Sequence, residues 1–171
     1  VTITVEGKRP LVAEVQALIA PSSSPQPRRV TSGLDSSRTA MMLGILERRA
    51  GLSLSTADCF VATVGGMRLL EPATDLATAL AIVSSVKDIS LPSGLVAIGE
   101  LGLAGDIRRI TGLEKRLDEA ARLGFTDAII PIGATVKTQG ILTHPVSNIA
   151  QAVTVMTSLT ARSKREGAPN P

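Results

Sequence analysis

Paired arginines are the residues of this chain best suited to binding chemistry. The formal net charge of the 171 residues is +3, and three basic residues against one acidic residue put +2 of it into the last ten. In the nearly neutral remainder, guanidinium groups could match the phosphate oxygens of a nucleic-acid backbone. The candidates for such contacts are Arg28, Arg29, Arg38, Arg48, Arg49, Arg108, Arg109, Lys115 and Arg116. The same residues could instead pair with carboxylates of a neighbouring subunit, or form plain solvated surface.

A glycine-rich segment, GELGLAG at 99–105, invites comparison with a phosphate-binding loop. Its spacing differs from G-x-G-x-x-G, and Asp106, which follows it, would repel a phosphate. We therefore expect a loop in which glycine allows a positive φ or a close backbone approach. No G-x-x-x-x-G-K-[ST] pattern occurs in the sequence, so no ATP site of the P-loop type is expected in this chain.

The single cysteine and the single histidine, Cys59 and His144, exclude an internal disulfide and a zinc-type ligand cluster. Cys59 lies in the apolar run CFVATV and His144 precedes a proline, so a catalytic thiol–imidazole pair is not favoured. We expect neither a metal nor a cofactor in this chain. A lone thiol also fits a reducing cytoplasm.

The composition predicts one globular domain over 1–160. Hydrophobic residues make up 44% of the chain and charged residues 19%, and no run approaches the roughly 18 apolar residues of a membrane span. The chain opens at Val1 without a signal-peptide pattern, which indicates a domain cut from a longer protein. The polar, basic segment 161–171 is expected to be a disordered tail. Phe60 and Phe125 lie in apolar segments typical of a core, so nucleic-acid contacts should be mostly to phosphates.

Apolar periodicity predicts the elements that must position these residues, in a mixed α/β fold. One helix begins at a cap on Asp35 or Ser36 and ends at Gly51. On it Arg38 and Arg49 fall within about 20° of the same face, as the ends of an exposed stripe. The other predicted elements are strands at 1–6, 10–19, 59–64, 95–98, 128–130 and 141–143, a tight turn at Gly65–Gly66, and helices at 75–86, 112–123 and 147–159.

Two segments resemble motif blocks of the Lon-type peptidase family. They are EPATDLATALAIVSS at 71–85 and GELGLAGDIRRITGLEKR at 99–116. When these segments are aligned without gaps with the family pattern, Asp75 takes the place of the nucleophilic serine and Glu114 that of the basic lysine. Neither carboxylate can do the work of a Ser–Lys dyad, and their negative charge opposes the stabilisation of an oxyanion. The resemblance therefore implies a fold of this family that has lost peptidase chemistry.

The resemblance also implies that Asp75 and Glu114 lie near each other, since their counterparts are neighbours in the family. Such a pair would raise at least one pKa or bind a cation. Alternatively, each carboxylate simply sits in the first turn of a helix, where the helix dipole favours it. Alternatively, the chain could be a peptidase relative that uses another nucleophile, such as Ser32, Ser36, Ser84 or Ser85. No lysine near any of these serines reproduces the dyad.

A narrower resemblance covers almost the whole chain. Several segments in the right order are similar to the C-terminal Lon-like domain of the RadA (Sms) family of bacterial DNA repair and recombination proteins. These segments are 6–19, 28–38, 45–54, 64–85, 99–110 and 119–131. The fold that this resemblance implies is the Lon-type proteolytic domain, related to the second domain of ribosomal protein S5.

For function, the resemblance implies a non-enzymatic scaffold and DNA-contacting domain in a hexameric ring. ATP, magnesium and zinc would belong to N-terminal parts that this chain does not contain, including a RecA-like ATPase that drives branch migration and D-loop extension. The implied partners are single-stranded and branched DNA, further copies of the chain and the RecA recombinase, with no membrane. The alternative is a purely structural module for ring assembly, without DNA contact.

Overall fold

Two hydrophobic cores organise the computed structural model, which describes residues 1–134 and 136–166. The larger core is enclosed by three helices, a three-stranded sheet and one face of a second, parallel sheet, and Leu46, Leu80 and Met156 are among its most deeply buried side chains. The helices are α1 (Ser36–Ala50), α2 (Asp75–Lys87) and α4 (Ile149–Glu166). Helix α2 is buried on most sides, as its apolar sequence predicts, because it contacts the sheet and both other helices.

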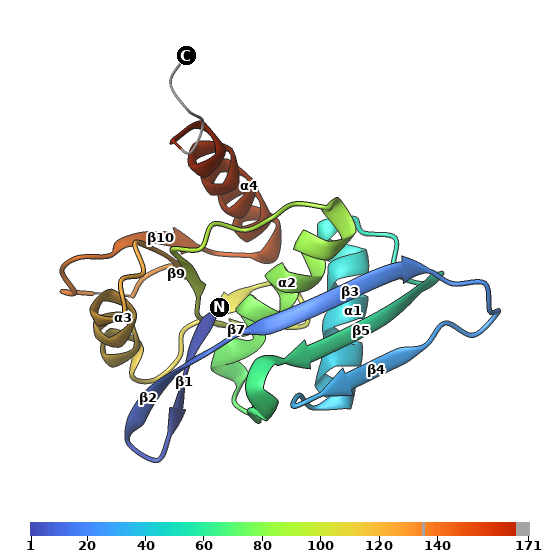
Figure 1. Ribbon diagram of the computed structural model, residues 1–171, viewed down its shortest axis with the longest axis horizontal. Helices are drawn as coiled ribbons and strands as arrows, with labels where there is room; N and C mark the ends of the chain where they lie inside the picture. Colours follow the sequence, from blue (N-terminus) through green and yellow to red (C-terminus); the bar gives the residue numbers. More distant parts are fainter. Residues whose placement is uncertain (135, 167–171) are drawn as a thin grey trace.

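The sheet of the larger core has α1 and α2 behind it in Figure 1 and an uncovered front face. Its central strand, β5 (Ala57–Thr63), runs antiparallel to β3 (Val15–Pro21) and parallel to β4 (Arg29–Ser32). Strand β4 is absent from the predicted elements. Its four residues are exposed or half-buried at the sheet edge, so they carry no apolar alternation that periodicity could detect.

The uncovered face of this sheet carries a row of apolar side chains. Phe60 of β5 lies directly between Leu18 of β3 and Val30 of β4 in the strand register. Leu18 and Val30 are exposed, and Phe60 is half-buried. The expectation that Phe60 belongs to the core is therefore wrong, because the strand alternation turns it away from the helices. Phe125 is also half-buried, but it packs against the smaller core.

The smaller core lies between a parallel sheet of order β10–β9–β6, an antiparallel hairpin and helix α3. Its elements are β1 (Thr2–Glu6), β2 (Arg9–Ala13), β6 (Leu95–Ala97), β9 (Asp127–Pro131), β10 (Leu142–Val146) and α3 (Leu113–Arg122). The hairpin joins the sheet where the N–H of Ala97 donates to the carbonyl of Val1 at 3.0 Å. Ile3 of β1 and Leu117 of α3 are completely buried together in this core, which fixes α3 against the hairpin.

Two strand predictions differ from the structure. The second predicted strand is divided at Glu14 into β2 and β3, so that one extended segment serves both cores. The glycine-rich segment contains a short hairpin, β7 (Glu100–Leu101) and β8 (Ile107–Arg108). A Cβ at Gly102 would lie 2.2 Å from Asp106 Oδ1, so this glycine is needed for a close approach, as the sequence predicts.

The predicted cap and turn signals of the larger core are confirmed. Asp35 caps α1, because its side chain accepts from the N–H of Arg38 at 2.7 Å, and Gly51 ends the helix with φ 67°. Gly65 and Gly66 both have φ 71°, as the predicted tight turn requires. Two short 3-10 turns lie on either side of residues 67–71: η1 (Val64–Gly66) and η2 (Pro72–Thr74).

Helix α4 continues through residue 166 and projects away from the body (Figure 1). The Arg162 guanidinium donates to Asp127 Oδ2 of β9 at 2.7 Å, and basic residues in the last turn suit the helix dipole. The expected disordered tail is therefore wrong for 161–166, and its remainder, 167–171, lies outside the described residues. No helix in the described part is both long enough and apolar enough to cross a membrane.

Candidate functional site

Asp75, which the resemblance aligns with the Lon serine, is held in a bidentate ion pair. Asp75 opens α2, and Arg38 Nε and Nη2 reach its two carboxylate oxygens from α1 at 2.6 and 2.5 Å. The N–H of Leu101 adds a hydrogen bond to Oδ2 at 3.1 Å. The Asp75 side chain is only 3% exposed, so these donors replace water around its charge. The hydrogen bond to Asp75 raises the pKa of the Arg38 guanidinium, and the pair contains neither the hydroxyl nor the neutral amine of a Ser–Lys dyad.

Glu114 lies apart from this ion pair. It is exposed in the first turn of α3, where it lines a hollow with Arg109 and Gly133. Asp75 lines a different hollow of about 260 Å³, together with Arg108. Within the described residues, no hydrogen bond or ion pair connects the two carboxylates, and no cluster of three potential ligands could hold a metal. The geometry does not favour a pair of neighbouring carboxylates. It favours the alternative, in which each carboxylate sits in the first turn of its own helix, where the helix dipole stabilises it.

Arg28 fastens the start of β4 to β5. Its Nε and Nη2 donate to Asp58 Oδ2 at 2.9 and 2.7 Å, and its backbone N–H donates to Oδ1 at 2.8 Å. These hydrogen bonds lower the pKa of Asp58 to about 2. The guanidinium also lies 5.4 Å from the ring centroid of Phe60. Arg28 remains 69% exposed, but Asp58 already balances its charge.

Arg29 is exposed, yet its guanidinium is occupied by the backbone. It donates to three backbone carbonyls, those of Arg28 at 3.5 Å, of Leu54 at 2.7 Å and of Ala57, and Nη1 lies 3.0 Å from Cys59 Sγ. Burial raises the pKa of the Cys59 thiol, which keeps it neutral. His144 lies in the other sheet, where Nε2 is 2.7 Å from Asp127 Oδ1. Cys59 and His144 therefore form no thiol–imidazole pair.

Two further arginines among the candidates for DNA contact form ion pairs with carboxylates. Arg108 of β8 pairs with Asp106 at 2.7 Å and lies 3.6 Å from Glu100. Arg116 of α3 is 5% exposed, and its two terminal nitrogens donate to Glu71 at 2.7 and 2.8 Å. The prediction of a DNA contact by Arg116 is corrected by this burial, because a phosphate could reach the buried guanidinium only by displacing the half-buried Glu71.

The ion pair of Arg116 also ties three segments together. Glu71 accepts from Thr4 Oγ1 at 2.7 Å and from the N–H of Val5 at 2.9 Å, and Arg116 Nη1 donates to the carbonyl of Ile3 at 2.7 Å. Burial by itself raises the pKa of Glu71, but the hydrogen bonds from Arg116, Thr4 and Val5 bring it below its usual value. No local pattern signals this cluster, because its partners are 45 and 67 residues apart in the chain.

The remaining predicted candidates are exposed, and none has a carboxylate partner in the described part of the chain. They are Arg48, Arg49, Arg109 and Lys115. Arg49 packs beside Gly105, where an added Cβ would lie 3.1 Å from Arg49 Cβ. The predicted stripe of Arg38 and Arg49 is thus only partly exposed, because Arg38 turns toward Asp75.

Some exposed basic residues outside the predicted set also lack a carboxylate partner among residues 1–134 and 136–166, unlike Arg122 and Arg162, which pair with Glu119 and Asp127. They include Lys8 and Arg9 at the β1–β2 turn and Arg68 between η1 and η2. A signal for them exists in the sequence, since E-G-K-R and G-G-M-R each place a basic residue beside a glycine turn.

Comparisons with known proteins identify relatives of this chain. A family model described as subunit ChlI of Mg-chelatase matches residues 65–134. A DNA repair protein RadA from Mycolicibacterium smegmatis is 51% identical over 156 residues, which are 91% of this chain and 33% of the relative. RadA from Mycobacterium tuberculosis is 46% identical over 159 residues, 93% of this chain and 33% of the relative. RadA from Bacillus subtilis is 41% identical over 156 residues, 90% of this chain and 34% of the relative.

Sequence identity of 41–51% over nine tenths of the chain shows common ancestry with these relatives. The chain is homologous to one region of RadA. It spans about a third of the length of the curated RadA relatives that it matches. The ChlI model covers less than half of the chain, from η1 to the loop after β9, and this region includes both Asp75 and Glu114. The predicted resemblance to RadA is confirmed.

Proposed function

We propose that this chain is the C-terminal Lon-like domain of a RadA-type DNA repair protein, and that it acts as a non-enzymatic ring scaffold with a DNA-contacting surface. The repair role follows from its relatives, which are DNA repair proteins of the RadA type. The observation that carries the non-enzymatic part is the Arg38–Asp75 ion pair at the position of the nucleophile. ATP hydrolysis, magnesium, zinc and branch migration are assigned to the two thirds of such a protein that this chain does not cover.

The contact between the two motif blocks supports a Lon-type fold. The N–H of Leu76 donates to the carbonyl of Gly99 at 3.0 Å, and the N–H of Gly99 donates to the carbonyl of Ala73 at 2.9 Å. The segments that resemble the serine block and the lysine block are thus joined by backbone hydrogen bonds. A relation to the second domain of ribosomal protein S5 is part of the same proposal.

Exposed basic side chains without carboxylate partners support the DNA contact, because they can pair with a phosphate without first breaking an ion pair. For the whole protein, the proposed partners are single-stranded and branched DNA and the RecA recombinase. Its proposed assembly is a homo-hexamer, and its proposed location is the cytoplasm. A purely structural assembly module is the competing function, since unpaired basic residues can also meet the carboxylates of a neighbouring subunit.

Fluorescence anisotropy of labelled single- and double-stranded DNA across a salt series tests this proposal. Light scattering in the same buffers reports the oligomeric state. We expect an affinity that falls as salt rises, with a log–log slope equivalent to several phosphates. A confirmed oligomer without DNA affinity would instead favour the assembly module.

A peptidase with another serine nucleophile finds little support in the geometry. Ser84 Oγ donates to the carbonyl of Ile89 at 2.5 Å, and Ser85 Oγ accepts from the N–H of Ile19 at 2.9 Å. Both hydroxyls are therefore engaged by the backbone, whereas Ser32 and Ser36 are exposed. Casein incubated with a high concentration of the protein should stay intact.

A further inference from the structure

We propose that the outer edge of β4 binds an extended peptide segment of a partner protein, which adds a strand to the sheet of the larger core. Two features would hold this segment. One is the backbone of Arg29 and Thr31, and the other is the row of Leu18, Phe60 and Val30 on the uncovered face, here called the apolar row. The proposed site requires neither DNA nor a second copy of the chain.

The backbone groups of Arg29 and Thr31 point away from β5. The N–H of Cys59 donates to the carbonyl of Arg28 at 2.9 Å, and in the parallel register β4 pairs with β5 through alternate residues, 28, 30 and 32. The residues between them therefore turn their N–H and C=O groups to the outer edge. No other element of the described chain runs along this edge (Figure 1), and no described group forms a hydrogen bond with the backbone of either residue.

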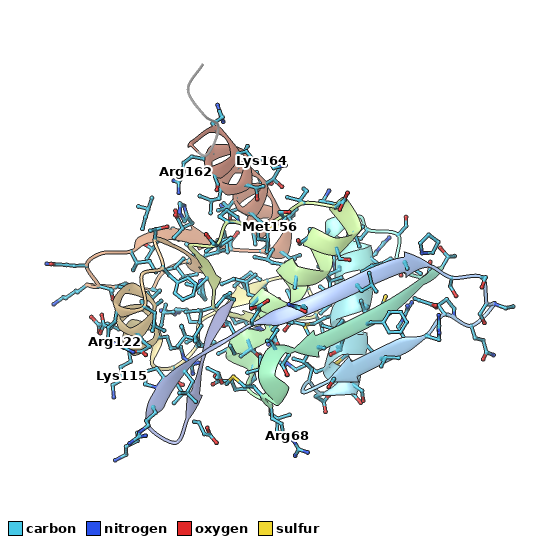
Figure 2. All side chains as sticks on the ribbon, viewed as in Figure 1. Arg68, Lys115, Arg122, Met156, Arg162 and Lys164 are labelled. Atoms are coloured by element: carbon cyan, nitrogen blue, oxygen red, sulfur yellow. The ribbon has the colours of Figure 1, made fainter. Side chains whose placement is uncertain are left out.

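The same edge already pairs with an extended segment at its far end. Gly33 is the next outward residue, and its carbonyl accepts from the N–H of Leu69 at 2.8 Å. Leu34 and Leu69 also form an isolated parallel bridge. Arg68, which lies in this crossing segment, points into solvent below the sheet in the view of Figure 2. The segment thus crosses the end of β4 and leaves the two residues before it open.

The apolar row lies beside this open edge. Leu18 is 60% exposed and Val30 49%, and the half-buried Phe60 joins them across the strand register. Residues opposite each other on neighbouring strands share a face of the sheet, so a partner residue opposite Val30 would extend the row. The unpaired backbone groups fit an extended chain, and the apolar row fits an apolar side chain at that position.

The charges beside the edge are already satisfied. Arg28 pairs with Asp58 at 2.7 Å, and the guanidinium of Arg29 donates to three backbone carbonyls. Native edge strands are commonly protected by lysine or proline, and β4, with the sequence RVTS, has neither. An uncharged strand of alternating apolar and hydroxyl residues therefore fits this edge better than an acidic or a phosphorylated ligand.

The test uses a fluorescein-labelled peptide, Lys-Thr-Val-Thr-Val-Thr-Lys, whose valines can lie on one face. Thr31→Pro removes an outward N–H without removing a hydrogen bond to β5, and proline is tolerated at such edge positions. The row variant is Leu18→Thr/Val30→Thr. The matched control, Val12→Thr/Leu142→Thr, makes the same two replacements at exposed positions of β2 and β10. A peptide with proline as its central residue keeps the test decisive if Thr31→Pro fails to fold, which circular dichroism melts report.

Fluorescence anisotropy should show that the wild type and the matched control bind the peptide, whereas Thr31→Pro and the proline peptide do not. The row variant should bind about tenfold more weakly, equivalent to the loss of roughly two buried methylene groups. Amide hydrogen exchange locates the contact. In the free protein the amides of Arg29 and Thr31 should exchange faster than those of Val30 and Ser32, and the peptide should slow them.

Three results would overturn the proposal. Binding that survives Thr31→Pro, or an equal loss in the row variant and the matched control, would place the peptide elsewhere. Amides of Arg29 and Thr31 that exchange at the same rate with and without the peptide would exclude the added strand. Slow exchange of these amides in the free protein that is lost on dilution would assign the edge to a second copy of the chain. Each result is independent of the DNA contact proposed above.

Discussion

Removal of Arg38 should destabilise the fold more than removal of Asp75, although the two form one ion pair. The Asp75 side chain is 3% exposed and that of Arg38 is 30% exposed. Arg38→Leu leaves a buried carboxylate with the N–H of Leu101 as its remaining donor, at a cost of about 3–5 kcal/mol. Asp75→Asn leaves a guanidinium that water can reach and an amide oxygen that still accepts, at a cost of about 1–3 kcal/mol. The melting temperature should fall by roughly 6–20 °C in the first variant.

Urea unfolding followed by far-UV circular dichroism measures these costs, because the chain has no Trp or Tyr to report by fluorescence. The double variant Arg38→Leu/Asp75→Leu should recover most of the stability, since no buried charge is then left unpaired. Arg122→Leu is the matched control, because it breaks a surface pair with Glu119 and should lower stability far less than Arg38→Leu. The reasoning is refuted if Asp75→Asn is the more costly single variant, or if the double variant is no more stable than Arg38→Leu.

Three further predictions concern Asp58, two glycines and a serine placed at position 75. The backbone N–H and guanidinium of Arg28 lower the pKa of Asp58 from 3.8 to about 2, so its contribution to stability is complete above pH 3.8 and lost as the pH falls toward 2. Acid unfolding should therefore be less steep in Asp58→Asn, and equal slopes would contradict this. Gly105→Ala should cost about 1–2 kcal/mol because φ is 86°, whereas Gly44→Ala in α1 should stabilise by about 0.5–1 kcal/mol in the same urea assay. Asp75→Ser should digest casein no faster than buffer, since it restores a hydroxyl without a base.

Local patterns in the sequence predicted much of the secondary structure. The cap at Asp35, the stop at Gly51 and the glycine turn at 65–66 lie where their chemistry places them, because caps and turns depend on residues close in the chain. The burial of α2 also follows from its composition, since a helix that is apolar on most sides must lie between layers. Strand β4 and helical residues 161–166 were missed because each depends on contacts with distant segments.

The state of each charged residue was decided by the tertiary structure. Residue identity and motif order were enough to reveal the resemblance to RadA, and the same resemblance aligns Asp75 and Glu114 with the Ser–Lys dyad of the Lon family. Only the fold showed that Arg38 and Arg116 form ion pairs with Asp75 and Glu71, whereas Lys8, Arg9 and Arg68 have no carboxylate partner among the described residues. The physical reason is that an ion pair depends on distance and burial, and its partners here lie tens of residues apart in the chain.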